Sequence, residues 1–475
     1  MTSLNERLLR RFRARERTAC GSLAALLVGL AACGSSGGGA GPGADASASD
    51  DGARGDGEPV SDSTAPRDDA STSRDGGTGA ADSGSRGDSG SDAGLAACDS
   101  GALSADEQTL VNLPADSWYT AQGTSFLGSG ACIPVPGGSE GCGAVINDWS
   151  GGVYDPVHDK MLIWGGGHNG YWGNEVYSFD PASFTWKRET TPSAVTAASL
   201  DQDPLPDGNP DARHTYDQIA YITHANRLWS RGGSRANDGS STGLTWTLDL
   251  GTQQWTNRIP TGAPWVTTYG TFNGASAYDP TTRKVFLQTV EGLQTYDYDT
   301  NTWAQVIGFG SAPLWPRYMT YGCKRGAIDT KRSLFFTFGG GDYFVFDITA
   351  SDIVTDSWIT TGGGAFDNSS YAGIGQSYPN EVIHTGGGDV ITACPGVDYD
   401  PRADALVAWK GGAPYVLDLA SKVWTAMSAT GALPTPSMNG VYGRFRYIAK
   451  YNVFILVNGP NDDVTFYKHT AGCGP

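Results

Sequence analysis

From about residue 145 onward, short apolar runs alternate with polar turns in an order that repeats along the chain. A first strand ends in a polar turn, as in Tyr278-Asp279-Pro280, and a second, apolar strand ends in glycines, as in Leu162–Gly167. A third strand ends in aspartate, as in Tyr177-Ser178-Phe179-Asp180, and a fourth carries a tryptophan such as Trp186. Four strands joined by short turns predict an antiparallel sheet that must stack on its neighbours to bury its apolar faces.

The repeat predicts an all-β propeller of four-stranded blades. Units begin near residues 145, 214, 272, 319, 394 and 438, which gives six blades, or seven if the 359–392 insertion hides one. The last unit stops after its third strand, whereas Leu110–Trp118 looks like an isolated fourth strand. We therefore expect the N-terminal strand to complete the last blade and close the ring, which removes open sheet edges. The repeated tryptophans are Trp118, Trp186, Trp255, Trp303, Trp358 and Trp424.

The glycine runs, the aromatic residue of the third strand and the tryptophan of the fourth strand resemble the kelch repeat and the wider galactose-oxidase-like propellers. The resemblance covers residues 140–475 and the strand at 108–120. The third blade departs from it, with Gln288–Gly292 where glycines belong, and the sixth has only Asn458-Gly459. Kelch propellers bind ligands, and galactose-oxidase-like enzymes build their sites, on the face that carries the glycine loops.

The N-terminal residues differ in composition from the repeats. Six arginines precede the short apolar stretch Leu23–Leu30, and Leu30-Ala31-Ala32-Cys33 resembles a bacterial lipobox. This predicts a signal peptide at 1–32 and a lipid on Cys33, or else an ordinary secretory peptide with a chance cysteine. Residues 33–96 are rich in Gly, Ser, Ala and Asp and have almost no large apolar side chain, so we expect a disordered tether. The propeller then spans 97–475, and the chain is expected to be exported and lipid-anchored to the bacterial envelope, at the outer membrane or cell surface.

Charge and cysteine content restrict the partners. The net charge is −18, and 22 basic against 36 acidic residues leave −14 on 97–475, which argues against nucleic acid and against direct contact with anionic lipid. We expect a monomer that reaches the membrane through its lipid only. Six cysteines remain in the exported domain, which favours disulfides. Of the possible pairings we favour Cys98–Cys473, Cys132–Cys142 and Cys323–Cys394, because the expected fold brings these pairs together.

Strand alternation separates two faces of the ring. The short turns between strands one and two, and between three and four, lie on what we call the turn face. The glycine loops and the links between blades lie on the opposite side, the glycine face, together with the long insertions 121–144, 189–212 and 359–392. Long loops in a compact domain are usually functional. The glycine face is therefore the predicted binding face.

Aromatic, amide and guanidinium groups are expected around the mouth on this face, which suits a saccharide or an anionic ligand. The predicted ligand-binding residues are Asn169, Trp172, Asn174, Arg213, Arg235, Arg317 and Arg444. Neighbouring candidates are Tyr171, Tyr318, Asp342, Lys410 and Asn439. Alternatively, Asn174 bonds only to backbone, and Arg213 and Arg317 pair only with carboxylates. His158 and His224 are expected to be surface residues of the turn face, and His384 has no assigned place.

Three functions fit these residues. The first is a tethered module that binds a glycan or a protein and needs no catalytic group. The second is a lyase for acidic glycans, in which His168, His214, Tyr216 and Arg231 supply the acid, the base and a cation for the substrate carboxylate. The third is a copper oxidase like galactose oxidase, but the Tyr-His pair of that family is absent. No cofactor is expected, although the acidic loop Asp201–Asp211 is either a structural calcium site or a solvated loop.

Overall fold

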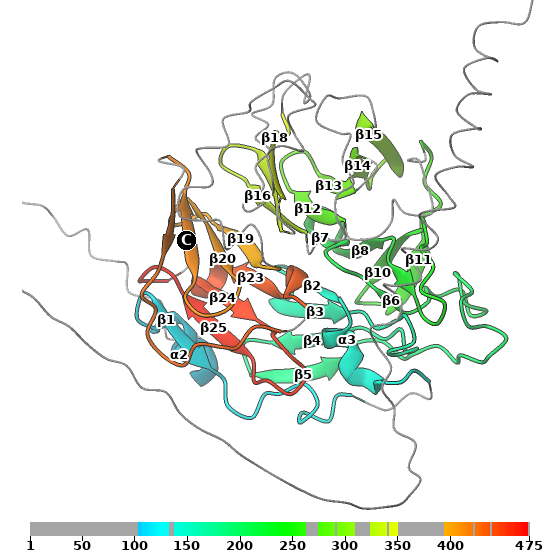
Figure 1. Cartoon of the computed structure of the whole chain (residues 1–475), viewed down its shortest axis with the longest axis horizontal. Coiled ribbons are helices and arrows are strands. Elements are labelled where there is room, and N and C mark those ends of the chain that lie inside the picture. Colours follow the sequence, from blue (N-terminus) through cyan, green and yellow to red (C-terminus); the bar gives the residue numbers. More distant parts are fainter. Residues whose placement is uncertain are drawn as a thin grey trace, which may run out of the picture. The chain divides into compact units, whose positions relative to one another are not determined.

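The computed structural model describes residues 103–132, 137–262, 274–289, 292–308, 324–339, 342–349, 394–420, 423–437 and 439–473. These residues form an all-β propeller of six antiparallel blades (Figure 1). The prediction of six blades is confirmed, while the 359–392 insertion lies outside the described residues. So do the leader, Cys33, the tether, Cys98, Cys323, Arg317, Tyr318, His384 and Trp358.

The first three blades follow the expected strand order. Blade 1 consists of β2 (Gly151–Asp155), β3 (Lys160–Trp164), β4 (Tyr177–Asp180) and β5 (Thr185–Arg188). Blade 2 consists of β7 (Ile219–Ile222), β8 (Arg227–Arg231), β10 (Thr245–Asp249) and β11 (Gln254–Asn257), and it carries the hairpin of β6 (Arg213–His214) with β9 (Ser234–Arg235). Blade 3 consists of β12 (Ala275–Asp279), β13 (Lys284–Thr289), β14 (Gly292–Asp297) and β15 (Thr302–Gly308).

The remaining blades complete the ring. Blade 4 has three described strands, β16 (Arg325–Asp329), β17 (Leu334–Gly339) and β18 (Asp342–Asp347). Blade 5 consists of β19 (Gly396–Asp400), β20 (Ala405–Trp409), β21 (Tyr415–Asp418) and β22 (Val423–Ala426). Blade 6 consists of β23 (Phe445–Ile448), β24 (Val453–Leu456), β25 (Thr465–Lys468) and the N-terminal β1 (Ser117–Thr120). The first strands β2, β7, β12, β16, β19 and β23 contact one another in turn around the axis, and β23 contacts β2.

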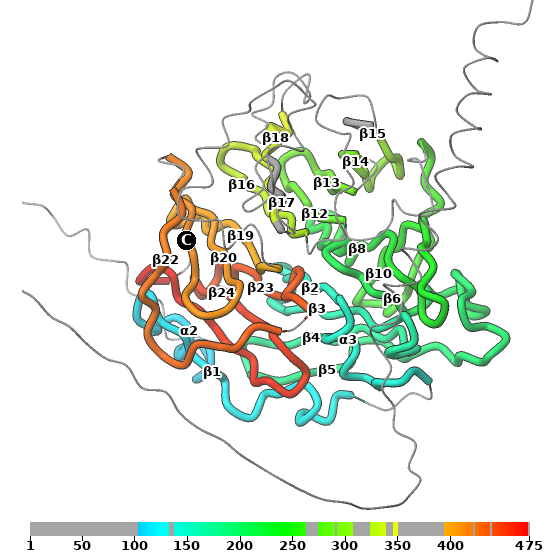
Figure 2. The backbone as a smooth tube through the Cα atoms, viewed as in Figure 1, coloured from blue at the N-terminus to red at the C-terminus, as the bar shows by residue number. Residues whose placement is uncertain are grey.

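The predicted closure of the ring is confirmed: β1 pairs antiparallel with β25, and Trp118 lies opposite Tyr467. Figure 2 shows the N-terminal blue-cyan part of the described chain beside the red C-terminal part. The predicted strand over Leu110–Trp118 is wrong in its first half, because Ala105–Val111 forms the helix α2. Ser104 and Glu107 form a capping box there, and this S-x-x-E signal overrides the apolar run that follows it.

Short helical turns complete the elements. They are η2 (Gly141–Gly143), α3 (Ala144–Asn147), η3 (Thr223–Ala225), η6 (Tyr442–Arg444) and η7 (Ala449–Tyr451). None of the described helices is long and apolar enough to cross a membrane.

The repeated tryptophan of the fourth strand explains how blades stack. Its ring lies against an aromatic residue on the second strand of the preceding blade: Trp255 meets Trp164 at 4.6 Å between ring centroids, and Trp303 meets Trp229 at 6.0 Å. The pairs Trp424–Phe338 (5.7 Å) and Trp118–Trp409 (5.9 Å) repeat this contact. Burying such large rings between two sheets stabilises the ring as a whole, so the core lies between blades rather than within one.

One device builds the turns between strands one and two. Asp400 closes its turn by accepting hydrogen bonds from the N–H groups of Arg402 (2.9 Å) and Ala403 (3.0 Å). The hydroxyl of Tyr399 donates to Asp404 Oδ1 (2.9 Å), and Asp404 has the left-handed φ of 54° that ends the turn. Every blade has such a left-handed residue at this place: Asp159, Asn226, Arg283, Ser333, Asp404 and Asn452.

Candidate functional site at the glycine face

A row of aromatic rings runs from the surface of the glycine face toward the ring axis. Centroids of Trp149 and His168 lie 5.1 and 5.4 Å from that of His214. The His214 ring lies 5.9 Å from Tyr216, and Tyr216 lies 5.9 Å from Tyr442. Trp149 is 39% exposed and His168 is exposed, whereas His214 is 3% exposed and Tyr442 is buried. We call these five residues the aromatic row.

Four members of the aromatic row have left-handed backbone. The φ values are 46° for Trp149, 40° for His168, 51° for Tyr216 and 48° for Tyr442. Bulky side chains rarely adopt this conformation, which costs free energy unless the surroundings enforce it. On the turn face, by contrast, most of the left-handed residues are Asp, Asn, Arg or Ser in tight turns. Strain gathered in adjoining aromatic residues is typical of a functional site.

Backbone contacts hold the row in place. Trp149 precedes β2, and its carbonyl accepts a hydrogen bond from the N–H of Tyr216 (2.8 Å). The N–H of His168 donates to the carbonyl of Arg235 in β9 (2.8 Å). Gly167 makes this approach possible, since a Cβ there would lie 2.5 Å from the Cα of Arg213 in β6. The hairpin of β6 and β9 thus fixes His214 between the loop of blade 1 and the axis.

Burial sets the charge of two groups in this region. Burial, with a smaller effect of His168, lowers the pKa of His214 to about 3, so its imidazole is neutral near pH 7. Burial and the neighbouring Glu140 raise the pKa of Asp148 to about 8, so the side chain beside Trp149 holds a proton at neutral pH. The site therefore offers a neutral imidazole as acceptor.

Charged side chains lie beneath the inner end of the row. The guanidinium of Arg325 stacks 3.8 Å from the ring centroid of Tyr442 and is buried. Arg446 pairs with Asp217 at 3.3 Å, and Asp217 also accepts a hydrogen bond from the N–H of Gly326 (2.7 Å). Gly443 permits this packing, because a Cβ there would lie 2.1 Å from the carbonyl oxygen of Gly152.

The structure brings together three of the four residues of the predicted lyase set: His168, His214 and Tyr216. Arg231 is buried elsewhere, where its guanidinium donates to Gln294 Oε1 (2.8 Å) and lies 4.6 Å from the ring centroid of Trp303. It belongs to the interface between blades 2 and 3. The guanidinium next to the row is that of Arg325, which the sequence analysis did not single out.

Three of the four predicted ligand-binding arginines bond to groups of the protein itself. Arg213 is buried and pairs with Asp203 at 2.9 Å. Arg444 is buried and donates to the carbonyls of Ser150, Gly440, Val457 and Asn458. Arg235 bonds to Ser240 and pairs with Asp238 at 3.2 Å. Loops that meet around an axis leave many carbonyls to be satisfied, and guanidinium groups satisfy them.

The amide and indole candidates divide in the same way. Asn169 is exposed beside His168. Asn174 is buried and holds the 189–212 insertion, since its amide donates to Ser193 Oγ (2.8 Å) and to the Pro210 carbonyl (2.7 Å). Trp172 packs against Gly137. Asn439 donates to the carbonyl of Asn147 (2.9 Å), and Tyr171 is buried. Lys410 lies 5.9 Å from the ring centroid of Tyr415, and the side chain of Asp342 lies outside the described residues.

The two turn-face histidines also make contacts. His158 bonds to Asp155 (2.6 Å) and keeps 40% of its side chain exposed. His224 is more buried than expected: it bonds to the Tyr278 hydroxyl (2.7 Å) and lies 3.1 Å from Asp299. It joins blade 2 to blade 3.

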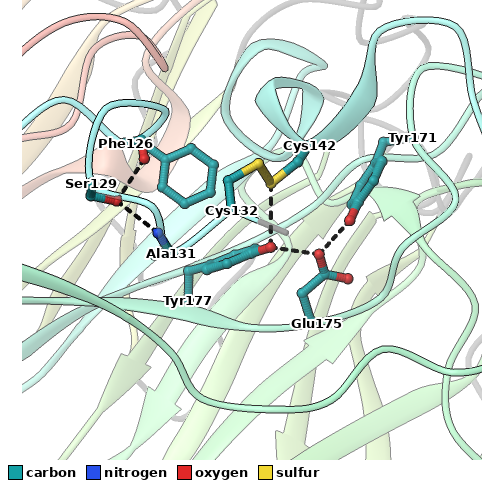
Figure 3. The surroundings of a disulfide bond; sticks show 8 residues. All are labelled: Phe126, Ser129, Ala131, Cys132, Cys142, Tyr171, Glu175 and Tyr177. Atoms are coloured by element: carbon teal, nitrogen blue, oxygen red, sulfur yellow. Dashed lines mark hydrogen bonds between the residues drawn. A yellow bond between two sulfur atoms is a disulfide. The ribbon is translucent and has the colours of Figure 1, made fainter. Parts of the chain in front are cut away.

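One predicted disulfide, Cys132–Cys142, is present at the base of the first long insertion (Figure 3). Cys142 Sγ lies 3.3 Å from the hydroxyl of Tyr177, which donates to Glu175 Oε1 (2.6 Å). The hydroxyl of Tyr171 donates to the same oxygen. Cys394 and Cys473 are disulfide-bonded as well, but their predicted partners lie outside the described residues, so those pairings remain predictions.

The acidic loop Asp201–Asp211 is tied to the protein itself. Asp201 accepts hydrogen bonds from Asn237 and Asp238, Asp203 pairs with Arg213, and Asp211 accepts from the N–H of Ala236 (3.3 Å). Within the described ranges, no three His, Cys, Asp or Glu side chains group as metal ligands.

Comparisons with known proteins add little about the site. No protein-family model matches the chain. It is 28% identical over 243 residues to acyl-CoA-binding domain-containing protein 4 of Arabidopsis thaliana, covering 49% of this chain and 34% of the relative. It is 27% identical over 208 residues to acyl-CoA-binding domain-containing protein 5 of the same plant, covering 42% and 30%. The chain thus spans about a third of the length of these relatives.

Two solved structures are weakly similar. One is a Bacteroides thetaiotaomicron protein of unknown function, with a TM-score of 0.38 and 10% identity over 66% of this chain and 67% of the other. The second is YjhT, with a TM-score of 0.40 and 14% identity over 70% of this chain and 94% of the other. The fold assignment rests on the strand pairing described above.

Proposed function

We propose that this protein is a binding module of the kelch type that takes a saccharide at the glycine face, on the aromatic row. The observation that best supports the proposal is the aromatic row itself. Most of its residues have left-handed backbone, and its rings pass from exposed at the surface to buried at the inner end. Sugar rings stack on exposed aromatic faces, and Trp149 with His168 offers such a surface. Exposed Asn169 beside them supplies donors and an acceptor for hydroxyl groups.

The lipobox and the tether support the rest of the proposal. A lipid on Cys33 and the predicted tether over 33–96 would hold the propeller outside the membrane of a bacterial envelope, where polysaccharides are available. A protein ligand at the same face is the alternative, and it differs from the saccharide in the area that it would bury.

A lyase for acidic glycans is the second candidate, favoured by the neutral His214 beside Tyr216. In such a reaction a base removes the proton next to the sugar carboxylate. The electron pair then forms a double bond while the bond to the leaving oxygen breaks, and an acid protonates that oxygen. Tyr216 would supply the acid and His214 the base, although the lowered pKa of His214 makes it a weak base. Arg325 is buried under Tyr442, so it would influence the ionisation of the Tyr442 hydroxyl rather than touch the substrate.

The test is a binding screen of the full-length protein against neutral and acidic polysaccharides by affinity electrophoresis, with absorbance near 235 nm recorded in parallel. We expect Trp149→Ala and His168→Ala each to weaken binding about tenfold. His158→Ala, a histidine on the turn face, is the matched control and leaves binding unchanged. Absorbance that rises and disappears in His214→Gln supports the lyase. Binding that survives both Trp149→Ala and His168→Ala refutes the assigned surface.

A further inference from the structure

The turn face has a cavity of its own on the ring axis. Its volume is about 280 Å³, and residues of all six first strands line it. Three residue positions recur from blade to blade. The rim carries Pro156, Thr223, Pro280, Thr330 and Pro401, and the next tier carries Tyr154, Tyr221, Tyr278, Ile328, Tyr399 and Tyr447. The glycine-face residues of the aromatic row are not among the lining residues, so this is a separate site.

The deeper tier departs from the repeat at two blades. Four blades place small aliphatic residues directly before the tyrosine or isoleucine position: Val153, Ala220, Ala277 and Ala327. Blades 5 and 6 place Asp398 and Arg446 there instead. Charged residues at a position that is apolar in the other blades indicate a role other than packing.

The two charged residues are used differently. Arg446 donates to the Gly443 carbonyl (3.0 Å) and pairs with Asp217, and neither of those residues lines the cavity. Asp398 is only partly buried, and it accepts hydrogen bonds from the N–H groups of Tyr399 (3.0 Å) and Tyr447 (2.9 Å). It forms no ion pair with any residue that the structure describes. A carboxylate has about four acceptor positions, so Asp398 keeps capacity for a ligand.

We propose that this axial cavity binds a small amphipathic amine, with its ammonium group at Asp398 and its apolar body against the aliphatic tier. Burial raises the pKa of Asp398, and Arg446 opposes that rise. An ammonium group in the cavity would stabilise the charged carboxylate further. The tyrosine tier encloses the body of the ligand, and the tyrosine hydroxyls keep their lone pairs as acceptors after donating to turn residues.

The lining argues against other ligand classes. A single carboxylate does not hold a metal ion, and no ligand cluster occurs in the described part of the chain. An anion would meet the carboxylate of Asp398, and the guanidinium of Arg446, which also lines the cavity, is already paired with Asp217. A polyhydroxylated ligand would place part of its hydroxyls against alanine and valine, which offer no hydrogen-bond partner. An amine with an apolar body would pair its ammonium group with Asp398 and pack its body against the aliphatic residues.

Titration calorimetry of the full-length protein with three probes of similar shape tests the proposal. The probes are 2-phenylethylamine, 2-phenylethanol and 3-phenylpropionate. We expect the amine to bind, the alcohol to bind about tenfold more weakly, and the acid to bind more weakly still. Equal affinities for amine and acid, or no binding of the amine at millimolar concentration, would overturn the proposal.

Two variants change the site by different routes. Asp398→Asn removes the charge, with Asp297→Asn in another turn as control. Ala277→Leu fills the cavity and keeps the carboxylate, with Ala304→Leu on the exposed side of β15 as control. Each site variant should lower amine affinity about tenfold or more, and neither should change saccharide binding at the glycine face. If Asp398→Asn does not fold, Ala277→Leu alone decides, and unchanged amine affinity there refutes the proposal.

Discussion

The two ends of the propeller are built on different principles. At the turn face, six blades use one solution, in which a left-handed turn residue ends the turn and, in most blades, an aspartate caps its N–H groups. At the glycine face the loops differ in length and sequence, and the left-handed positions include tryptophan, histidine and tyrosine besides glycine. Repetition therefore marks what the fold requires, while departure from it marks candidate function. The same rule identifies Asp398 within the regular end.

The largest effect should come from the crowded inner end of the glycine face. Gly443→Ala would place a methyl group 2.1 Å from the Gly152 carbonyl oxygen and 2.6 Å from Arg446 Nη2. Neither neighbour can move without breaking the axial cluster, so we expect a loss of about 3 kcal/mol or more in unfolding free energy. Urea denaturation measures it. Gly251→Ala, in a turn-face turn where only Asp249 Oδ1 lies near at 3.2 Å, should change stability little. Equal losses for both variants would show that the glycine face has no special packing.

The next largest effect concerns the aspartate that accepts hydrogen bonds from the N–H groups of the turn between strands one and two. Asp400→Ala leaves the N–H groups of Arg402 and Ala403 without an acceptor and removes the bond to His469 (2.8 Å). Asp400 is fully buried, so we expect a loss of about 2–3 kcal/mol by urea denaturation. Asp297→Ala, which removes one bond to the N–H of Thr300 in a more exposed turn, should lose about 1 kcal/mol. The comparison fails if the exposed turn is the more sensitive one.

Asp148 and His214 give the glycine face a pH dependence of its own. The pKa of Asp148 is raised to about 8, so the folded state keeps a proton that the unfolded state releases above about pH 4, and stability falls as pH rises through this window. The pKa of His214 is lowered to about 3, so stability falls as pH drops from about 6.5 toward 3.

Asp148→Asn should remove the alkaline part of this dependence. The difference in melting temperature between variant and wild type should therefore shift in favour of the variant as pH rises from about 5 to 8. His214→Gln should do the opposite, and gain relative to wild type as pH falls. A difference for Asp148→Asn that does not vary with pH would mean that Asp148 is ionised throughout.

The smallest effect should come from the hydrogen bond between a tyrosine hydroxyl and the residue that ends the turn. Tyr399→Phe removes the hydroxyl that donates to Asp404, but Asp404 keeps its ion pair with Arg332 at 2.6 Å. We expect a loss of about 1 kcal/mol by urea denaturation. Tyr447→Phe, whose partner is the neutral Asn452, should cost a similar amount. If either tyrosine variant lost more unfolding free energy than Asp400→Ala, the tyrosine hydroxyl would matter more to the turn than the aspartate.

The sequence predicted the blades well because each repeat is encoded locally. Tyr278-Asp279-Pro280 closes its own turn, and Trp255 sits at a fixed offset from the strand before it, so no distant contact is needed to recognise either. The α2 helix was missed because the apolar residues Leu110 and Val111 outweighed the capping signal of Ser104 and Glu107. Closure of the ring was nevertheless predictable, since the last unit lacks a fourth strand.

The site was predictable only in part, because it depends on which side chains from different loops meet in the folded protein. His168, His214 and Tyr216 were found through their loops, whereas Trp149, Tyr442, Asp148 and Arg325 were not. A signal was present: Trp149, Tyr216 and Tyr442 each stand two or three residues before a first strand. Arg213 and Arg444 looked like ligand contacts because the sequence does not show which carbonyls need donors.

Closure of the ring by β1 and β25 also constrains the order in which the propeller can fold. The strand that emerges first in the propeller must wait for the one that emerges last, about 350 residues later, before either finds its partner. The last blade therefore cannot form before β25 has been synthesised. Until then β24 keeps an open strand edge, at which unwanted strand pairing can occur.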